Sequence, residues 1–359
     1  MKITYIYHSG FLVESADAYY IFDYYRADFP VTDADKPVYV FVSHRHPDHY
    51  NPYVFEILRE KKVRRMTGII SYDIKPRNYT SHMEGVEIIA AEPDKEYTLD
   101  NGALVRTLRS TDKGVAYVVT FDDGGVPRSV YHAGDLNDWV WEGEDERVNK
   151  WMTGSYRRYL TAVEGMHFDA VMVPVDSRQG DDMFRGIEYL LEKVKADAVY
   201  PMHYWDKPEV IMQFAGKYPQ YADIIRYTED RMDRYSVIED KNPREIVLLR
   251  GSGCVYKKCT FCDYYSDSGR DEDVNYMINR AALSQVTGKY GNIEIINSGS
   301  VFELDKRTIE LIKKRCAECM IHTIHFEAHY LYNNRIEDLR REFADFELCL
   351  LYTSPSPRD

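Results

Sequence analysis

Residues 38–49 of this chain read Val38-Tyr39-Val40-Phe41-Val42-Ser43-His44-Arg45-His46-Pro47-Asp48-His49. The first five are nearly all apolar, as is typical of a strand buried on both faces. Side chains able to bind a metal ion follow the strand directly. Two imidazoles separated by one residue can bind one ion, while Asp48 and His49 turn toward a second. The stretch therefore predicts a metal site, suited to zinc, at the end of a buried strand.

Two later segments repeat this arrangement of a short strand followed by ligand residues. Residues 129–131 are expected to form a strand, and His132-Ala133-Gly134-Asp135 comes next. Residues 198–200 are also strand-like and precede Pro201-Met202-His203. A site with two metal ions needs a bridging carboxylate and a further imidazole. Asp135 and His203 are the candidates for these two roles.

The order of predicted elements indicates an α/β fold. Short strand-like runs dominate the first 135 residues and are separated by turn signals such as Asp122-Asp123-Gly124-Gly125. Helical periodicity occurs at residues 52–61 and 183–194, where apolar residues recur on one face. Strands and helices alternate after that. This pattern predicts a sandwich with sheets inside and helices outside.

With these motifs in order, residues 1–240 resemble the metallo-β-lactamase superfamily, which implies an αββα sandwich. The resemblance implies that His44 and His46 bind a first metal ion, that Asp48, His49 and His203 bind a second, and that Asp135 bridges them. It also implies that Asp23, at the end of an early strand, supports the histidine loop without binding metal. His8 and His132 flank the motifs and are candidates for substrate contacts or for supporting roles.

Within the superfamily, two segments look closest to the branch that contains L-ascorbate-6-phosphate lactonase. They are Tyr7-His8-Ser9-Gly10-Phe11-Leu12-Val13-Glu14 and Pro201-Met202-His203. The implied activity is hydrolysis of a small substrate, expected to be an anionic molecule, a lactone or a phosphoester, by a metal-activated water, with Asp48 and Asp135 as catalytic residues. The alternative is a non-catalytic metal- or ligand-binding module that partners a radical enzyme.

One departure from the family pattern affects the first metal ion. The family usually supplies a third histidine to it from a loop ahead of the Gly-Asp motif. Here His82 is the only histidine between His49 and His132, and it precedes a strand that comes too early. The loop itself reads Arg109-Ser110-Thr111-Asp112-Lys113-Gly114, so Asp112 is the candidate replacement. An oxygen ligand would shift the preference of the first site from zinc toward manganese or iron, or leave that site partly empty.

The six cysteines all lie at or after Cys254, which points to ligation of a metal or cluster and not to a disulfide scaffold. Residues 246–249 are strand-like and lead into Gly251-Ser252-Gly253-Cys254-Val255-Tyr256-Lys257-Lys258-Cys259-Thr260-Phe261-Cys262. Three cysteines leave one iron of a 4Fe-4S cluster open to an exchangeable ligand. This segment resembles radical S-adenosylmethionine enzymes, although four residues separate its first two cysteines where that family usually has three.

The same resemblance assigns S-adenosylmethionine contacts to Ser298, Gly299 and Glu327, in or after the next two predicted strands. The competing interpretation is a zinc site formed by the three cysteines together with a histidine or with Cys316 and Cys319. These last two cysteines are otherwise ordinary residues near a helix end.

The chain is expected to divide into three parts. Residues 1–240 form the hydrolase-like domain, and a polar stretch, Asp240-Lys241-Asn242-Pro243, precedes the second. Residues 241–348 have room for about three β/α units, so they are expected to be a truncated radical S-adenosylmethionine domain with a partial (β/α) barrel. Residues 349–359 resemble a reading frame of a sequencing-library adapter, and we expect them to be an artefact.

Composition excludes several classes of partner. The 359 residues include 46 basic and 59 acidic side chains, a net charge of −13, which argues against binding to nucleic acid. No apolar run approaches the ~20 residues that cross a membrane. The amino terminus lacks the apolar segment of a signal peptide, so a cytoplasmic location is expected. A small-molecule substrate is the expected partner, and the sequence does not specify the oligomeric state.

Overall fold

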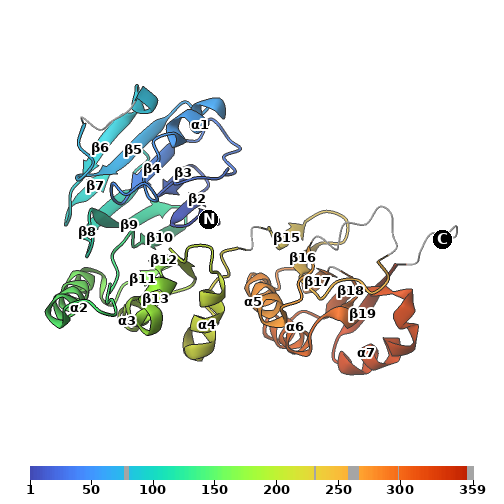
Figure 1. The fold of residues 1–359 in the computed structure, drawn as a ribbon. Coiled ribbons are helices and arrows are strands. Elements are labelled where there is room, and N and C mark those ends of the chain that lie inside the picture. The colour runs from blue at the N-terminus through green and yellow to red at the C-terminus, as the bar shows by residue number, and fades with distance from the viewer. Residues whose placement is uncertain (77–80, 230–231, 258–266, 298, 354–359) are drawn as a thin grey trace. The chain divides into compact units, whose positions relative to one another are not determined.

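The computed structural model describes residues 1–76, 81–229, 232–257, 267–297 and 299–353 (Figure 1). The chain forms two compact units, Met1–Arg231 and Met232–Asp359. The division falls ahead of the boundary expected at residue 240, because β15 (Tyr235–Ile238) pairs with the first strand of the second unit. Within the described part of the chain, no helix combines the length and the apolarity that crossing a membrane requires.

The first unit contains a six-stranded sheet in the order β1-β2-β3-β4-β5-β6. The first three strands are antiparallel neighbours, and β3 to β6 are parallel. The apolar run of residues 38–42 is β4, at the middle of this sheet, with every residue buried. The strand bounds are β1 (Lys2–Tyr7), β2 (Gly10–Glu14), β3 (Tyr19–Phe22), β4 (Val38–Val42), β5 (Met66–Ser71) and β6 (Glu87–Ala91).

A second six-stranded sheet has the order β14-β12-β10-β9-β8-β7. Here β10, β12 and β14 run parallel, so their carboxyl ends meet at one edge. The strand bounds are β7 (Glu96–Thr98), β8 (Leu104–Arg109), β9 (Val115–Asp122), β10 (Pro127–His132), β12 (Ala170–Pro174) and β14 (Val199–Met202). A two-stranded sheet joins β11 (His167–Phe168) to β13 (Lys195–Ala196).

Aromatic side chains join the inner faces of the two sheets. The Tyr117 hydroxyl on β9 donates to the backbone oxygens of Val42 (2.8 Å) and Ile69 (3.1 Å) on the other sheet. Tyr20 stacks on Phe121 with ring centroids 4.7 Å apart. Buried aromatic rings contribute large apolar areas to such a core. The sheets therefore form a sandwich, as the sequence predicted.

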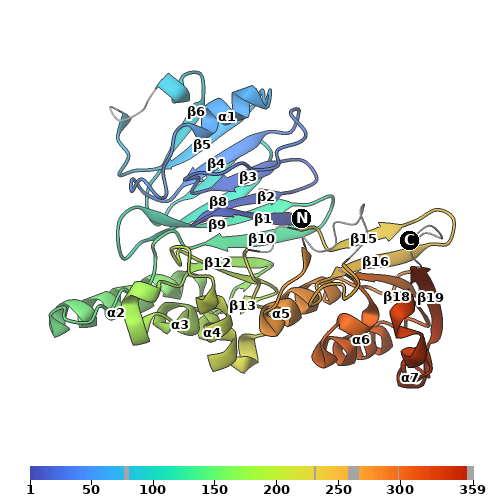
Figure 2. The same cartoon turned by 45° about the vertical axis from the view of Figure 1, so that its right-hand side comes forward.

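Helices cover the outer faces of this sandwich (Figures 1 and 2). Helix α1 (Val54–Glu60) packs into the apolar core around β4, while α3 (Arg185–Lys193) contacts β12. The remaining helices are α2 (Glu146–Leu160) and α4 (Glu209–Lys217), and short 3-10 turns are formed by Ser81–Met83, Thr161–Val163, Ser177–Asp182 and Pro219–Tyr221. The first unit is therefore the αββα sandwich expected from the sequence.

Gly114 brings the β8–β9 connection against the end of β4. Its φ is +73°, and a Cβ built there would lie 1.8 Å from the backbone oxygen of Ser43. The next residue, Val115, donates its backbone N–H to that same oxygen (2.9 Å). Only glycine permits both the left-handed backbone and this close approach. Gly114 thus fixes the loop that carries Asp112 beside the histidine loop.

The second unit is a five-stranded open sheet with the order β15-β16-β17-β18-β19. The four strands from β16 onward are parallel, while β15 is antiparallel to β16. Among the described residues the sheet does not close into a barrel, as expected for a partial (β/α) barrel. Its strands are β16 (Arg244–Leu249), β17 (Asn292–Asn297), β18 (Thr323–His329) and β19 (Glu347–Thr353).

Helices and 3-10 turns connect these parallel strands in the β/α order that the sequence predicted. The helices are α5 (Glu272–Leu283), α6 (Lys306–Glu318) and α7 (Ile336–Glu342), and the 3-10 turns are Val301–Glu303 and Tyr330–Arg335. Strand β19 contains residues 349–353, which were expected to be an artefact, and it pairs with β18 from Glu347 to Thr353.

A buried carboxylate anchors the first parallel strand of this unit. Glu245 is fully buried and accepts hydrogen bonds from the Tyr235 hydroxyl (2.7 Å), the Thr287 hydroxyl (2.9 Å) and the backbone N–H groups of Thr287 and Gly288 (2.7 and 2.8 Å). Burial alone would raise the pKa of Glu245, but these donors lower it below its ordinary value. The carboxylate therefore holds the loop after α5 against β16.

Candidate metal centre

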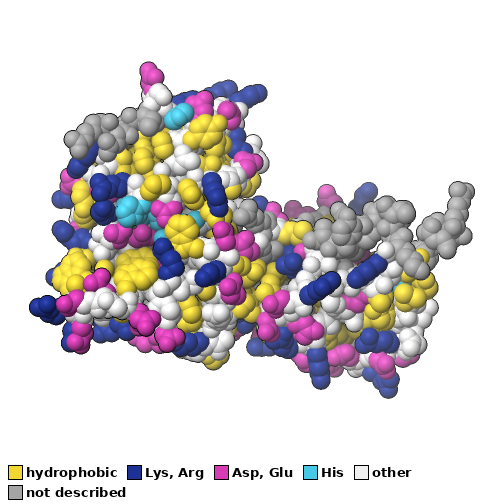
Figure 3. Space-filling view, in the orientation of Figure 1, with side chains coloured by type: hydrophobic (Ala, Val, Ile, Leu, Met, Phe, Trp, Pro, Cys, Tyr) yellow, Lys and Arg dark blue, Asp and Glu magenta, His cyan; other side chains and the backbone are white. Residues whose placement is uncertain are grey.

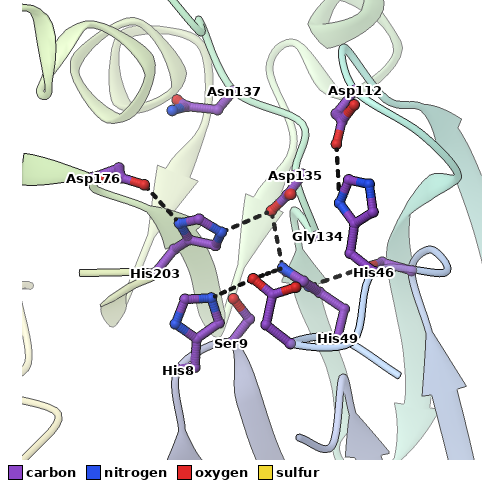
Figure 4. Close-up of polar contacts among 12 residues, drawn as sticks. His8, Ser9, His46, His49, Asp112, Gly134, Asp135, Asn137, Asp176 and His203 are labelled. Carbon is purple, nitrogen blue, oxygen red and sulfur yellow. Dashed lines mark hydrogen bonds and ion pairs between the residues drawn. The ribbon is translucent and has the colours of Figure 1, made fainter. Parts of the chain in front are cut away.

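Five separate segments of the first unit meet at one edge of the sandwich (Figure 4). The histidine loop follows β4, Asp135 follows β10 and His203 follows β14, as the sequence predicted. Asp112 comes from the β8–β9 connection, and His8 comes from the turn between β1 and β2. Asp135 and His203 follow parallel strands of the second sheet, whose carboxyl ends share one edge, and the histidine loop reaches them from the end of β4 in the first sheet.

The potential ligand atoms form two groups, in each of which all atoms lie within 4.8 Å of one another. One group contains the two residues proposed for the first ion together with Asp112 and the bridging carboxylate. The other contains the three residues proposed for the second ion, and also His8. The groups are His44, His46, Asp112, Asp135 and His8, Asp48, His49, His203.

The Asp135 carboxylate lies between these two groups. Its Oδ2 is 3.4 Å from His44 Nε2, whereas its Oδ1 is 3.3 Å from His49 Nε2 and 3.5 Å from His203 Nε2. The two oxygens thus face ligands of different groups. This is the placement that a bridging carboxylate requires.

Three of the histidines have their Nδ1 atoms held by oxygen partners. His49 Nδ1 lies 2.7 Å from Asp23, His203 Nδ1 lies 3.0 Å from Asp176, and His44 Nδ1 lies 2.9 Å from the Ser43 hydroxyl. Such contacts fix the ring orientation and the tautomer of a metal-binding histidine. They leave each Nε2 lone pair directed toward Asp135.

Several of the converging atoms are buried without a hydrogen-bond partner among the described residues. They are His8 Nε2, His44 Nε2, His49 Nε2 and Asp135 Oδ1. A buried polar atom left unpaired costs free energy, so a cluster of them calls for a further bound group. Imidazole nitrogens together with carboxylate oxygens suit a divalent transition-metal ion. The residues of this centre therefore fit one or two such ions.

The electrostatics of the centre favour a positive charge at its middle. Burial opposes the charged form of His49, yet the carboxylates of Asp135 and Asp23 raise its pKa to about 9. Burial also acts against the charged form of Asp23, but His49 and His132 lower its pKa to about 2. Burial, followed by the charge of His49, lowers the pKa of His44 to about 2. The carboxylates of Asp135 and Asp23 thus favour positive charge where the ligand atoms meet.

Asp23 and His132 support the ligands from outside. Asp23 accepts from Ser43 N (2.7 Å) and from the Ser43 hydroxyl (2.6 Å), in addition to His49. His132 is fully buried, with Nε2 2.8 Å from the Ser9 backbone oxygen and Nδ1 accepting from Gly134 N (3.1 Å). Both residues therefore lie beside ligand-bearing loops, Asp23 in the position proposed for it.

The β8–β9 connection is tied to the segment that carries Asp135. The Thr111 hydroxyl donates to the backbone oxygen of Asn137 (2.6 Å) and accepts from its backbone N–H (3.0 Å). This link brings Asp112 Oδ2 to 3.4 Å from His46 Nδ1, within the first group of potential ligands. Both side chains are more than one-third exposed, so this is the open end of the centre.

His8 and Asp176 have larger roles than the sequence indicated. His8 was considered a flanking residue, but its Nε2 is 3.3 Å from Asp48 Oδ2 and it joins the second ligand group. Asp176, which the sequence analysis did not consider, is fully buried beside His203 and also binds Arg178. Two sequence features indicate these residues: His8 stands in a hairpin turn ahead of an apolar strand, and Asp176 stands two residues after the end of β12.

In the second unit, the structure describes part of the cysteine motif. Cys254 follows β16, and a Cβ built on Gly299 would lie 3.1 Å from the Cys254 Cα, so these two proposed cofactor residues are neighbours. Glu327 lies on β18. Cys259, Cys262 and Ser298 lie outside the described residues.

The cysteines of the competing zinc interpretation belong to helix α6 and its end. Cys316 is fully buried in the apolar core, and burial raises the pKa of its thiol to about 12. The Cys319 thiol lies 3.4 Å from the backbone oxygen of Val286. Neither belongs to a group of potential metal ligands among the described residues.

Comparisons with known proteins give the following results. A family model described as beta-lactamase superfamily domain matches residues 2–148, which include every candidate ligand except His203. No curated protein matches this chain. A solved structure of queuine lyase from Clostridium spiroforme, bound to SAM and queuine, is 46% identical and covers 34% of this chain, with a TM-score of 0.33. This chain spans 52% of the length of that protein.

Two further solved structures match a larger share of the chain at lower identity. A metallo hydrolase from the archaeon Ignicoccus hospitalis is 20% identical, covers 62% of this chain and 93% of its own, and has a TM-score of 0.40. The metallo-beta-lactamase fold protein YhfI from Bacillus subtilis is 17% identical, covers 55% and 79%, and has a TM-score of 0.35. Residues 2–148, which match the family model for a beta-lactamase superfamily domain, lie within the αββα sandwich described above.

Proposed function

We propose that the first unit is a metal-dependent hydrolase that acts on a small molecule. The observation that carries this proposal is the Asp135 carboxylate, whose two oxygens face different groups of histidine and aspartate ligands. A centre of this kind holds two ions close enough to act on one substrate. The resemblance to the branch that contains L-ascorbate-6-phosphate lactonase adds lactones and phosphoesters to the substrates to be assayed.

Different residues of the centre have different roles in hydrolysis. When bound, divalent ions polarise a substrate oxygen and lower the pKa of water, which supplies the attacking nucleophile. Asp48 borders the recess above the centre and orients the attacking water, while Asp135 holds the two ligand groups together. Asp23 and Asp176 keep the imidazoles of His49 and His203 directed inward.

The identity of the ions follows from the donor set. With Asp112 as a carboxylate ligand, the group around His44 and His46 has two nitrogen and two oxygen donors. A carboxylate in place of a third imidazole shifts the preference of this first group toward manganese or iron. The second group has three histidines, which suit zinc. We therefore infer that the two positions differ in metal preference.

Metal analysis of the purified full-length chain tests the centre. We expect one or two transition-metal ions per chain, and a lower content in Asp135→Ala. His167→Ala is the matched control, because His167 is an exposed histidine paired with Asp197 away from the centre. A folded wild-type protein that binds no transition metal after incubation with Zn²⁺ or Mn²⁺ would overturn the proposal.

Hydrolysis assays separate the enzyme from the alternative, a non-catalytic binding module. Lactones, phosphoesters and thioesters are offered to protein loaded with Zn²⁺ or Mn²⁺. Turnover that disappears in Asp135→Ala supports the hydrolase. Full metal occupancy without turnover of any substrate class favours the non-catalytic module.

For the second unit we propose a 4Fe-4S cluster and S-adenosylmethionine binding as part of a radical S-adenosylmethionine domain. The position of Gly299 against Cys254 supports this, because it places the small-residue turn after β17 beside the cysteine segment. Anaerobic reconstitution with iron and sulfide should give a four-iron spectrum that is lost in Cys254→Ala and kept in Cys319→Ala. Binding of zinc alone, lost in Cys319→Ala, would support the zinc site in its place.

A further inference from the structure

A recess of about 330 Å³ opens over the metal centre. Figure 3 shows hydrophobic side chains next to histidine and acidic side chains on this face of the first unit. The volume is at the small end of the roughly 300–1,000 Å³ of small-molecule sites. The recess is lined by residues of the centre and by a set of aromatic side chains: His46, Asp48, Thr111, Asp112, Asp135, Trp139, Trp141, Met152, Arg178, His203 and Trp205.

Three of the four tryptophans of the chain line this recess. The rings of Trp139 and Trp141 are parallel within 2°, with centroids 5.9 Å apart. Trp139 and Trp205 lie on His203, at centroid distances of 5.5 and 5.7 Å. The indoles therefore stand directly beside a metal-ligand candidate and not at a remote surface.

Two of the indoles lie in a connecting segment and not in a helix. Trp139 and Trp141 lie in the connection between β10 and α2, which begins only after the cap Asp145. The Trp139 Nε1 donates to the backbone oxygen of Asp135 (2.9 Å), which fixes this indole to the ligand segment. Trp205 is 37% exposed and is therefore available to a ligand.

Arg178 is the only basic side chain among the described residues that line the recess, apart from the histidines. Its Nε and Nη2 donate to the fully buried carboxylate of Asp176, at 2.9 and 2.5 Å. Its guanidinium carbon lies 5.1 Å from the Trp205 ring and 5.9 Å from the Trp141 ring. Because no described residue accepts from Nη1, this nitrogen can donate to a ligand oxygen.

The charges of the recess disfavour a multiply charged substrate. The Arg178 charge is already balanced by Asp176, and the recess has no lysine among its described lining residues. Two divalent ions would bring four positive charges, which the four carboxylates of Asp23, Asp48, Asp112 and Asp135 balance if the histidines bind as neutral imidazoles. No excess positive charge remains to attract a phosphate dianion.

We propose that this recess binds a flat, uncharged ring attached to the carbonyl group that is hydrolysed. The inference rests on the proposed hydrolase and names its substrate class as an aromatic lactone, ester or amide. The ring stacks against the indoles, and Arg178 Nη1 donates to an oxygen of the substrate. For a lactone, the oxygen of water bonds to the carbonyl carbon, the ring C–O bond breaks, and the departing oxygen takes a proton. The products are a carboxylic acid and an alcohol or phenol on one molecule.

Calorimetric titration of the Zn²⁺-loaded full chain tests recognition apart from turnover. The probes are 2-naphthamide, cyclohexanecarboxamide and 1-naphthyl phosphate. We expect the planar amide to bind about tenfold more tightly than the non-planar amide, and at least as tightly as the phosphate. Trp205→Leu should weaken 2-naphthamide about tenfold and change cyclohexanecarboxamide less than twofold.

Trp151→Phe is the matched control, because Trp151 is exposed on α2 and does not line the recess. It should bind all three probes as the wild type does. Equal affinities for the two amides, tighter binding of the phosphate, or equal effects of the Trp205 and Trp151 substitutions would overturn the proposal.

The rates of hydrolysis of two lactones test whether binding in the recess affects turnover. Dihydrocoumarin should be hydrolysed with a kcat/KM at least tenfold above that of δ-valerolactone, and Trp205→Leu should reduce that ratio. Hydrolysis of both lactones at the same rate would overturn the ring preference but leave the hydrolase in place. Selective binding of 2-naphthamide without hydrolysis of any substrate would retain the recess and refute the hydrolase.

Discussion

Replacing Asp176 by asparagine tests whether this buried carboxylate orients a metal ligand. Its Oδ2 accepts from His203 Nδ1 (3.0 Å) and Arg178 Nη2 (2.5 Å), while its Oδ1 accepts from Arg178 N (2.9 Å) and Nε (2.9 Å). Burial alone would raise the pKa of Asp176, but His203 and Arg178 hold it below the usual carboxyl range. The residue is therefore an ionised acceptor at neutral pH.

The asparagine amide has one acceptor oxygen, so either orientation leaves two of these donors facing an N–H₂ group. A hydrogen bond to a charged group contributes about 1.5–3 kcal/mol, but Arg178 is half-exposed and water replaces part of its loss. We expect the metal-free protein to lose about 2–4 kcal/mol of unfolding free energy. Loss of a contact that orients a ligand typically reduces metal affinity about 10- to 100-fold.

Two measurements separate these effects. Urea unfolding of the metal-free protein gives the change in stability, and competition with a chelator gives the Zn²⁺ affinity. Asp197→Asn is the matched control, because Asp197 makes the same kind of contact with His167 (2.9 Å) at an exposed position. It should change stability by less than about 1 kcal/mol and leave the Zn²⁺ affinity unchanged. Wild-type Zn²⁺ affinity in folded Asp176→Asn would refute the orienting role.

Three further predictions concern the frame of each unit and the second ligand group. Glu245→Gln should make the thermal unfolding of the second unit less dependent on pH. Folding lowers the pKa of Glu245, so the ionised carboxylate stabilises the folded state above the ordinary pKa of 4.5. In the wild type this stabilisation is lost as the pH falls through the pKa of the folded state. In urea unfolding, Gly114→Ala should lower the free energy of unfolding by at least about 2 kcal/mol more than Gly102→Ala does. Gly102 has a similar positive φ, but no atom lies within 4 Å of an added Cβ. Equal losses of unfolding free energy would refute the close approach of Gly114 to Ser43 as the cause. His8→Ala should lower the metal content by up to one ion per chain, whereas His82→Ala should not, and unchanged Zn²⁺ binding in His8→Ala would exclude His8 as a ligand.

The sequence predicted the parts of the centre that follow strand ends. An apolar run identifies β4 as buried, and the position of His44 to His49 directly after it needs no knowledge of distant contacts. Asp135 and His203 follow parallel strands of the second sheet, so their convergence comes from topology. Asp112 was proposed because the resemblance to the metallo-β-lactamase superfamily implies a ligand from its loop. Local pattern and sheet geometry account for the other residues.

Other features depend on contacts between segments far apart in the chain. Trp139 and Trp141 precede a helix, and only the cap at Asp145 and the indole hydrogen bond to Asp135 reveal that they lie in a loop over the centre. Asp176 follows a buried strand, as the predicted ligands do. Its carboxylate, however, contacts Nδ1 of His203, the ring nitrogen that does not face Asp135. No periodicity distinguishes an aspartate that binds metal from one that orients a histidine.

The sequence predicted His8 only as a flanking residue, because its position is set by the backbone of a distant strand end. Its backbone oxygen accepts from His203 N (3.2 Å), and both residues have positive φ, 59° and 66°. Non-glycine residues in the left-handed region cost about 1–3 kcal/mol each, so the surrounding structure must hold them there. Trp205 continues the strained run with φ of 48° and packs on His8 at a centroid distance of 4.4 Å. The β1–β2 turn and the segment after β14, both with left-handed residues, thus hold the imidazoles of His8 and His203 and the indole of Trp205 against one another.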